Sequence, residues 1–381
     1  MVQNKLLYAV TGLTAAEIIH KRVDTYKPNM RHASSFVIKL LIFVSLLLTF
    51  FSSLKAEEYN IPPSMRYTID REENVLPIIY YFSPPDTVDR EYPILVLCEG
   101  SSSKGDVGSV FFIREYFAER IQAFQVGYLT IEKWGVDGNQ IDEKEFWNHY
   151  SRSQRLKDHL VVLDYLQEHP PQGWNGQFIF IGVSEGGPLV TDLSITYPNT
   201  LATINWVGAG DWNWADELWQ FFENWKQNSF WIRLYDSIPR WFPFSSDIPP
   251  TRQEFDALVE HIIHNPTPNK SMGGMTYFYH ADAFLKPSVD YSKIQSPFLV
   301  VKGTADSDIE SCDQFVQKAM EAGAPITYFC IEGMDHWLRK RPDVIDQSFD
   351  WLKIQLRLPK TNPMQITSGL AEIMGEQGGS F

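Results

Sequence analysis

The sequence predicts an α/β protein with a mostly parallel sheet and helices on both faces. Three observations support this fold class. Short apolar runs closed by turn residues alternate with helix-like segments from about residue 60. The runs are apolar at nearly every position, as expected of strands buried on both faces. The chain has 381 residues, 44% of them hydrophobic, so it can bury a large core.

The predicted elements follow one another in a regular order along the chain. Strands are predicted within 74–85, 92–100, 126–138, 177–184, 201–210, 296–308 and 326–336. Helices are predicted within 108–125, 153–167, 185–197, 311–323 and 344–356. Strands that alternate with helices in this way form parallel sheets, because each helix carries the chain back to the start of the next strand.

The alternation stops after Gly210 and resumes near residue 293. Residues 211–292 are rich in Trp and lack strong strand signals, so we expect a helical cap between core segments 57–210 and 293–358. One helical face is predicted to hold Trp214, Leu218, Phe221 or Phe222, and Trp225. Two interpretations stay open: the cap lines an acyl or alcohol pocket, or it packs its own core. The polar, Gly-rich segment 359–381 is predicted to be a flexible tail.

The N-terminal segment 1–56 differs in charge from the rest of the chain. It holds seven Lys or Arg and two acidic residues, a net charge of +5, so a chain of net charge −14 carries −19 on the remainder. An acidic body repels phosphate backbones, so we expect no nucleic-acid partner.

The same segment has the layout of a secretory signal. Arg31 and His32 precede an apolar run over 40–51, and small residues follow up to Ala56. This run is shorter than the roughly 20 residues that span a membrane. The sequence therefore predicts an exported protein, periplasmic or secreted, with Met30 as the true start. The alternative is an uncleaved N-terminal anchor, which would be the one point of membrane contact.

The three cysteines do not form a metal-binding pattern. Cys98 and Cys330 lie inside apolar runs, which predicts buried, unreactive thiols, and with Cys312 the count is odd. Neither a metal-binding motif nor a Gly-rich nucleotide-binding loop is found in the sequence. We therefore expect no metal and no cofactor.

One motif joins a buried strand to a helix. The stretch FIFIGVSEGGPLV places Ser184 between Gly182 and Gly186 where the apolar run ends. Such a pattern is typical of a nucleophile elbow, although G-x-S-x-G also occurs by chance. A serine hydroxyl needs a neighbouring base to act as a nucleophile.

The candidate base and acid also follow predicted strands. His336 follows the last strand in IEGMDHW, and Asp306 follows the preceding one in VVKGTADSD. Because parallel strands gather their carboxyl ends at one edge, we expect Ser184, Asp306 and His336 to meet there. Asp308 and Asp335 remain rival acids. Each signal is weak alone, but the order Ser, Asp, His on successive strand ends favours a catalytic triad.

These residues carry a resemblance to the α/β-hydrolase superfamily over about residues 60–356. The matching motifs are GVSEGG, GTAD and GMDH, and the second favours Asp306 over Asp308. The resemblance implies an eight-stranded, mostly parallel sheet with a cap inserted after the sixth strand. It also implies an oxyanion hole, with backbone amides of Ser101 and Glu185 as donors. Relatives usually carry His-Gly where this chain has Glu99-Gly100, which puts the side-chain hydrogen bonds of that loop in doubt.

The predicted function is cleavage of a carboxylic ester through an acyl-enzyme intermediate. The expected substrate is a small-molecule or lipid-like ester. A serine aminopeptidase or acyltransferase is the alternative, since fold and triad do not fix the acceptor. Glu185 could serve a peptidase by gripping a substrate amine. A non-catalytic binding module is a third hypothesis, disfavoured because both Ser184 and His336 are present.

Overall fold

The fold is described from a computed structural model, which covers residues 61–71, 76–87, 90–208, 210–228 and 249–357. Contacts between residues separate the chain into a unit of residues 1–58 and a unit of residues 59–381. The predicted signal and the tail 359–381 lie outside the described residues. Within the described part, no helix is long and apolar enough to cross a membrane.

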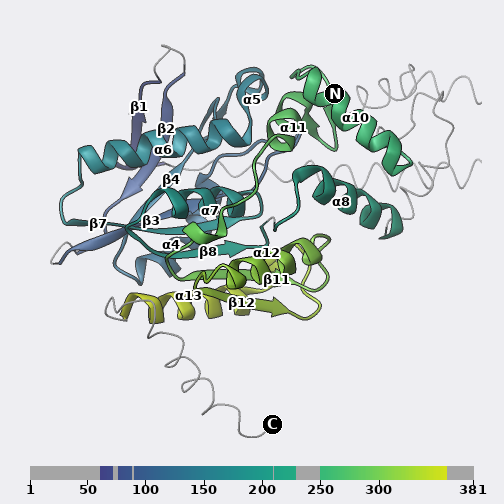
Figure 1. Ribbon diagram of the computed structural model, residues 1–381. Helices are drawn as coiled ribbons and strands as arrows, with labels where there is room; N and C mark the ends of the chain where they lie inside the picture. The colour runs from purple at the N-terminus through teal and green to yellow at the C-terminus, as the bar shows by residue number, and fades with distance from the viewer. Residues whose placement is uncertain (1–60, 72–75, 88–89, 209, 229–248, 358–381) are drawn as a thin grey trace, which may run out of the picture. The chain divides into compact units, whose positions relative to one another are not determined.

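An eight-stranded sheet forms the centre of the second unit (Figure 1). Its order is β1-β2-β4-β3-β7-β8-β11-β12. The first two strands pair antiparallel, as do β2 and β4, and the remaining neighbours pair parallel. The strands are β1 (Arg66–Ile69), β2 (Ile78–Ser83), β3 (Tyr92–Cys98), β4 (Gly127–Ile131), β7 (Trp174–Val183), β8 (Thr200–Trp206), β11 (Phe298–Gly303) and β12 (Ile326–Ile331).

Helices cover both faces of this sheet, as the apolar strands require. The core helices are α4 (Phe111–Gln122), α6 (Arg152–Glu168), α7 (Gly186–Thr196), α12 (Ile309–Glu321) and α13 (Pro342–Arg357). In β7, Ile179 and Ile181 pack in one cluster with α4 and α13. Phe178 and Phe180 point the other way and pack with α6 and α7. The predicted fold class is confirmed.

The segment between β8 and β11 is mainly helical. It contains α8 (Trp214–Asn228), α10 (Arg252–His264) and α11 (Tyr277–Phe284), with β9 (Ser271–Met272), β10 (Met275–Thr276) and the short helix η2 (Tyr291–Lys293). β8 is the sixth strand of the main sheet in chain order, so the insertion lies where the fold prediction placed it. Shorter elements elsewhere are η1 (Pro63–Met65), β5 (Val136–Asp137), β6 (Gln140–Ile141), α5 (Glu143–His149) and η3 (Leu338–Lys340).

The described cap helices pack a core of their own. The cluster holds Leu218 and Phe222 of α8, Phe255 and Ile262 of α10, Met272 and Ala281. Trp214 and Trp219 pack against it, while Phe221 is 48% exposed. The buried face of α8 therefore uses Phe222 and not Phe221. The side chain of Trp225 lies outside the described residues. Of the two interpretations left open, a self-packed cap is what the described part shows.

One cysteine prediction is wrong. Cys98 is buried, and burial raises the pKa of its thiol to about 12. Cys330 is exposed, although it lies in an apolar run. Cys330 lies in β12, the edge strand of the sheet, and every residue of this strand is at least partly exposed.

Candidate active site

Ser184 sits on a strained turn between β7 and α7. Its φ is +54°, a left-handed conformation that costs a non-glycine residue about 1–2 kcal/mol. The flanking glycines are required by close backbone approach. A Cβ on Gly182 would lie 2.2 Å from the carbonyl oxygen of Gly186, and one on Gly186 would lie 2.2 Å from that of Cys98. The sequence motif is therefore a true elbow that lifts the serine off the strand end.

The structure brings Ser184, His336 and Asp306 together. His336 Nε2 lies 3.0 Å from Ser184 Oγ, and His336 Nδ1 lies 3.0 Å from Asp306 Oδ2. The imidazole is 44% exposed, whereas the Asp306 side chain is almost fully buried. A reactant could therefore approach the serine and histidine from solvent while the carboxylate stays shielded.

Lys302 of β11 pairs with both acidic residues of the loop that carries Asp306 and Asp308. This lysine was not predicted from the sequence. The lysine is fully buried, with its Nζ 3.0 Å from Asp306 Oδ2 and 2.6 Å from Asp308 Oδ1. Burial would raise the pKa of Asp306, but the His336 hydrogen bond and the Lys302 charge outweigh it and hold this pKa below its usual value. A lysine inside an otherwise apolar strand was the available signal.

The two rival acids have other partners. Asp308 pairs with Lys302, and Asp335 pairs with Lys340 and accepts the amide of Trp337. Asp306 is the carboxylate that reaches His336. Asp306, Asp308 and His336 are close enough to share a metal ion, but Lys302 Nζ already lies against both carboxylates, so we assign no metal here.

The loop after β3 passes directly over the serine. A Cβ on Gly100 would lie 3.2 Å from Ser184 Cβ and 3.7 Å from Ser184 Oγ. The next residue, Ser101, is exposed, and Ser102 is buried. Within the described chain, no hydrogen bond is found for the amides of Ser101 and Glu185. The Ser102 amide is already used, since it donates to Tyr150 Oη at 3.1 Å.

Glu99, the departure from the expected His, is neutralised by a lysine. Its Oε1 lies 2.6 Å from Lys133 Nζ, a pair that is almost fully buried on the lysine side. Its carbonyl oxygen accepts a hydrogen bond from Arg155 at 2.9 Å. The loop is therefore held at residue 99 by an ion pair to its side chain and a hydrogen bond to its carbonyl.

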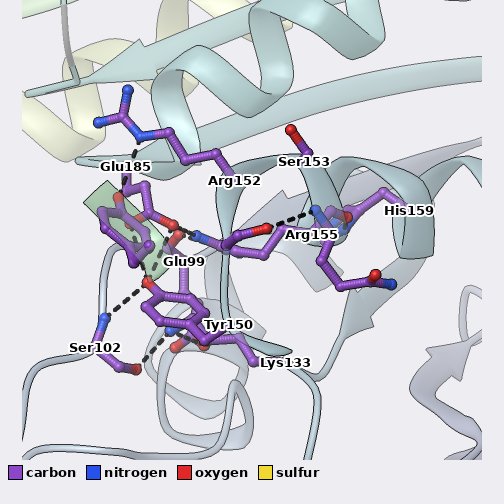
Figure 2. Close-up of polar contacts among 12 residues, drawn as sticks. Glu99, Ser102, Lys133, Tyr150, Arg152, Ser153, Arg155, His159 and Glu185 are labelled. Atoms are coloured by element: carbon purple, nitrogen blue, oxygen red, sulfur yellow. Dashed lines mark hydrogen bonds and ion pairs between the residues drawn. The ribbon is translucent and has the colours of Figure 1, made fainter. Parts of the chain in front are cut away.

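The structure contradicts the suggestion that Glu185 grips a substrate amine. Its carboxylate is buried and accepts hydrogen bonds from Arg155, Tyr150 and Tyr279 (Figure 2 shows the first two). Burial alone would raise the pKa of Glu185, but Arg155 and Arg152 lower it below its usual value. The group is charged, and its carboxylate is paired with buried donors.

A cavity of about 460 Å³ is lined by Glu185 together with α6, α7, α11 and the loop after α11. Its walls include Arg152, Leu189, Asp282 and Lys286. Ser184 and His336 do not line it, so this cavity is not the space in front of the candidate nucleophile.

The cap also contributes a buried carboxyl group, that of Glu217. Glu217 of α8 accepts hydrogen bonds from the amide of Gly210 and the hydroxyl of Ser311. Burial raises the pKa of Glu217 to about 7, with Arg152 opposing and Asp308 adding to the rise.

This raised pKa predicts a pH-dependent stability. A carboxyl whose pKa is higher in the folded state loses its stabilising contribution as pH rises from its usual value of 4.5 to about 7. From pH 5.5 to 8, we expect the free energy of unfolding of the wild type to fall by about 2 kcal/mol more than that of Glu217→Gln. Guanidinium unfolding at several pH values measures this. Free energies of unfolding that change equally with pH in the wild type and in Glu217→Gln would contradict this prediction.

Solved structures align with about three quarters of this chain. Proline iminopeptidase from Mycobacterium smegmatis aligns with a TM-score of 0.50 and 14% identity over 76% of this chain and 98% of its own. VinJ aligns with a TM-score of 0.50 and 17% identity over 77% of this chain and 100% of its own. The α/β hydrolase GrgF from Penicillium sp. sh18 aligns with a TM-score of 0.48 and 14% identity over 77% of this chain and 99% of its own. No protein-family model matches the sequence, and no curated protein does.

Structural similarity at such low sequence identity shows the fold and nothing about the activity. The alignments, together with the strand order, the turn after β7 and the cap after β8, show that the chain has the α/β-hydrolase fold. The fold that the superfamily resemblance implies is confirmed.

Proposed function

We propose that this protein is a serine hydrolase that cleaves a carboxylic ester through an acyl-enzyme intermediate. The carrying observation is the placement of the His336 imidazole, 3.0 Å from both Ser184 Oγ and Asp306 Oδ2. These are the distances at which a histidine can take the serine proton while a carboxylate orients its other nitrogen.

The proposed reaction proceeds in two steps. Ser184 Oγ attacks the ester carbonyl and its proton moves to His336 Nε2, while Asp306 stabilises the imidazolium. The amides of Ser101 and Glu185 donate to the oxyanion. His336 then gives the proton to the leaving alcohol. Water, activated by His336, attacks the acyl-enzyme in the second step and releases the acid, which returns Ser184 to its starting state.

An ester is favoured over a peptide substrate by two features. Glu185, the acid suggested to hold a substrate amine, is already neutralised by Arg155. Trp337, which follows His336, is 58% exposed and offers an apolar surface beside the proposed site. We therefore propose an uncharged or lipid-like ester as the substrate class.

Substrate assays with the purified full chain test this proposal. We expect hydrolysis of p-nitrophenyl esters, with a preference among acyl chains of graded length. Aminoacyl p-nitroanilides should be cleaved at least about 100-fold more slowly, because Glu185, the acid considered for gripping the amine, is paired with Arg155. Faster cleavage of the anilides would make the protein a peptidase. Activity on neither class would leave the proposal without support.

A further inference from the structure

The two backbone segments that supply the proposed oxyanion donors are joined by buried side chains. Tyr150, which caps the C-terminus of α5, accepts the Ser102 amide at 3.1 Å and donates to the Glu185 carboxylate at 2.9 Å. Arg155 of α6 makes a second bridge, from the Glu185 carboxylate to the carbonyl of Glu99. Figure 2 shows both bridges. Glu99 and Ser102 flank the proposed donor Ser101, and the amide of Glu185 is the other donor.

Lys133, which lies just beyond β4, adds a third link on the loop side. Its Nζ contacts Glu99 Oε1 at 2.6 Å and donates to Ser102 Oγ at 2.9 Å. The loop is thus held at both its ends. Lys133 and Arg155 hold the carboxylate and the carbonyl of Glu99, and Tyr150 and Lys133 hold the amide and the hydroxyl of Ser102. This arrangement leaves the Ser101 amide between two fixed points.

The network is buried, so its geometry is stiff. Tyr150, Arg155, Lys133 and Glu185 are each 7% exposed or less. The Tyr150 ring stacks on Phe146 and Tyr279, with centroids 4.5 and 5.1 Å away. Burial, with Glu185 adding to it, raises the pKa of Tyr150 well above its usual value, so the phenol keeps the proton that it donates.

Each carboxylate in the network is paired with a cation, which matters beside a developing oxyanion. The carboxylates of Glu99 and Glu185 face the cations of Lys133 and Arg155. An unpaired carboxylate on the residue after the nucleophile would repel negative charge on the substrate oxygen. Pairing with Arg155 removes that repulsion and turns Glu185 into an anchor.

We propose that Tyr150 is a positioning residue that sets the spacing between the two oxyanion donors by tying the Ser102 amide to the Glu185 side chain. The inference rests on the proposed function. An oxyanion hole acts through donors held at a fixed place before the charge forms, so a looser loop should weaken the transition state and leave substrate binding intact.

Tyr150→Phe in the full chain is the test, because it removes only the bridging hydroxyl. Tyr197→Phe is the matched control: Tyr197 is also buried and its hydroxyl also bonds a carboxylate, that of Asp164, but it caps the C-terminal end of α7, at the other end of that helix from Glu185. We expect Tyr150→Phe to lower kcat on a p-nitrophenyl ester by about 10- to 100-fold with little change in KM, below the loss caused by removing a whole donor. Tyr197→Phe should retain nearly the wild-type kcat.

Inhibition by an alkyl boronic acid, which mimics the tetrahedral intermediate, separates positioning from general damage. Its Ki should rise in Tyr150→Phe by about the factor that kcat falls. An unchanged Ki, or equal kinetics in both variants, would overturn the inference.

Two further outcomes keep the test interpretable. If Tyr150→Phe does not fold, Glu185→Gln keeps the shape of the side chain that Tyr150 ties to the loop but weakens the hydrogen bond from the Tyr150 hydroxyl, and should lower kcat by about three- to tenfold with a matching rise in Ki. A wild-type kcat and Ki in Glu185→Gln would then overturn the inference. If the wild type itself hydrolyses no ester and binds no boronic acid, the proposed function fails, and the inference that rests on it fails with it.

Discussion

Replacing Ser184 by alanine should lower kcat for ester hydrolysis by about 10⁵- to 10⁶-fold. The reason is that Ser184 Oγ is the hydroxyl that His336 Nε2 contacts, so among the described residues it is the one placed to form the acyl-enzyme. The double variant Ser184→Ala/His336→Ala should be no slower than the single one, because the two residues act as a unit. Steady-state assays with a p-nitrophenyl ester measure both.

Ser101→Ala is the matched control for this loss. It removes a hydroxyl from the exposed residue beside the serine but keeps the backbone amide that is the proposed oxyanion donor. We expect kcat close to that of the wild type. Equal losses in Ser101→Ala and Ser184→Ala would show that the site tolerates no change at all, and would remove the case for Ser184 as the nucleophile.

Asp306→Asn is expected to lower kcat by about 10⁴-fold, whereas Asp308→Asn should lower it by less than about tenfold. Asp306 accepts from His336 Nδ1, so an amide there would favour the wrong imidazole tautomer. Asp308 instead pairs with Lys302. The two changes are chemically identical and two residues apart, which makes each the control for the other.

The pair of variants decides the identity of the acid. Both kcat values should be measured alongside thermal unfolding, because each change leaves Lys302 with one carboxylate fewer. A larger loss in Asp308→Asn than in Asp306→Asn would assign the role to Asp308. The hydrogen bond from His336 to Asp306 would then not be the one used in catalysis.

The parts of the site that follow strand ends could be predicted from the sequence. Ser184, Asp306 and His336 each come directly after an apolar run, and a parallel sheet brings such positions to one edge. The elbow could also be read from its glycines, because the steric demand of the turn leaves few alternatives. Chain order and local pattern were sufficient to predict that these three side chains meet.

The supporting network could not be predicted in the same way. Glu99, Lys133, Tyr150, Arg155 and Glu185 come from five separate segments, and no spacing rule connects them. Glu185 was misread because its position beside the nucleophile suggested a substrate contact. Burial reversed that role, since a charge removed from water is stable only when other groups in the protein pair with it. The prediction that Cys330 is buried was wrong for a related reason. An apolar run predicts a strand, but burial of its side chains depends on which other elements pack against it.

The most direct test of the proposed enzyme is covalent labelling of the full chain with a fluorophosphonate, followed by intact-mass and peptide analysis. The account predicts one added phosphonyl group, located on Ser184, and no labelling of Ser184→Ala or His336→Ala. This result would identify an activated serine independently of any choice of substrate. A folded wild type that remains unlabelled, or a label on another residue, would contradict the central claim that Ser184 is the nucleophile of a serine hydrolase.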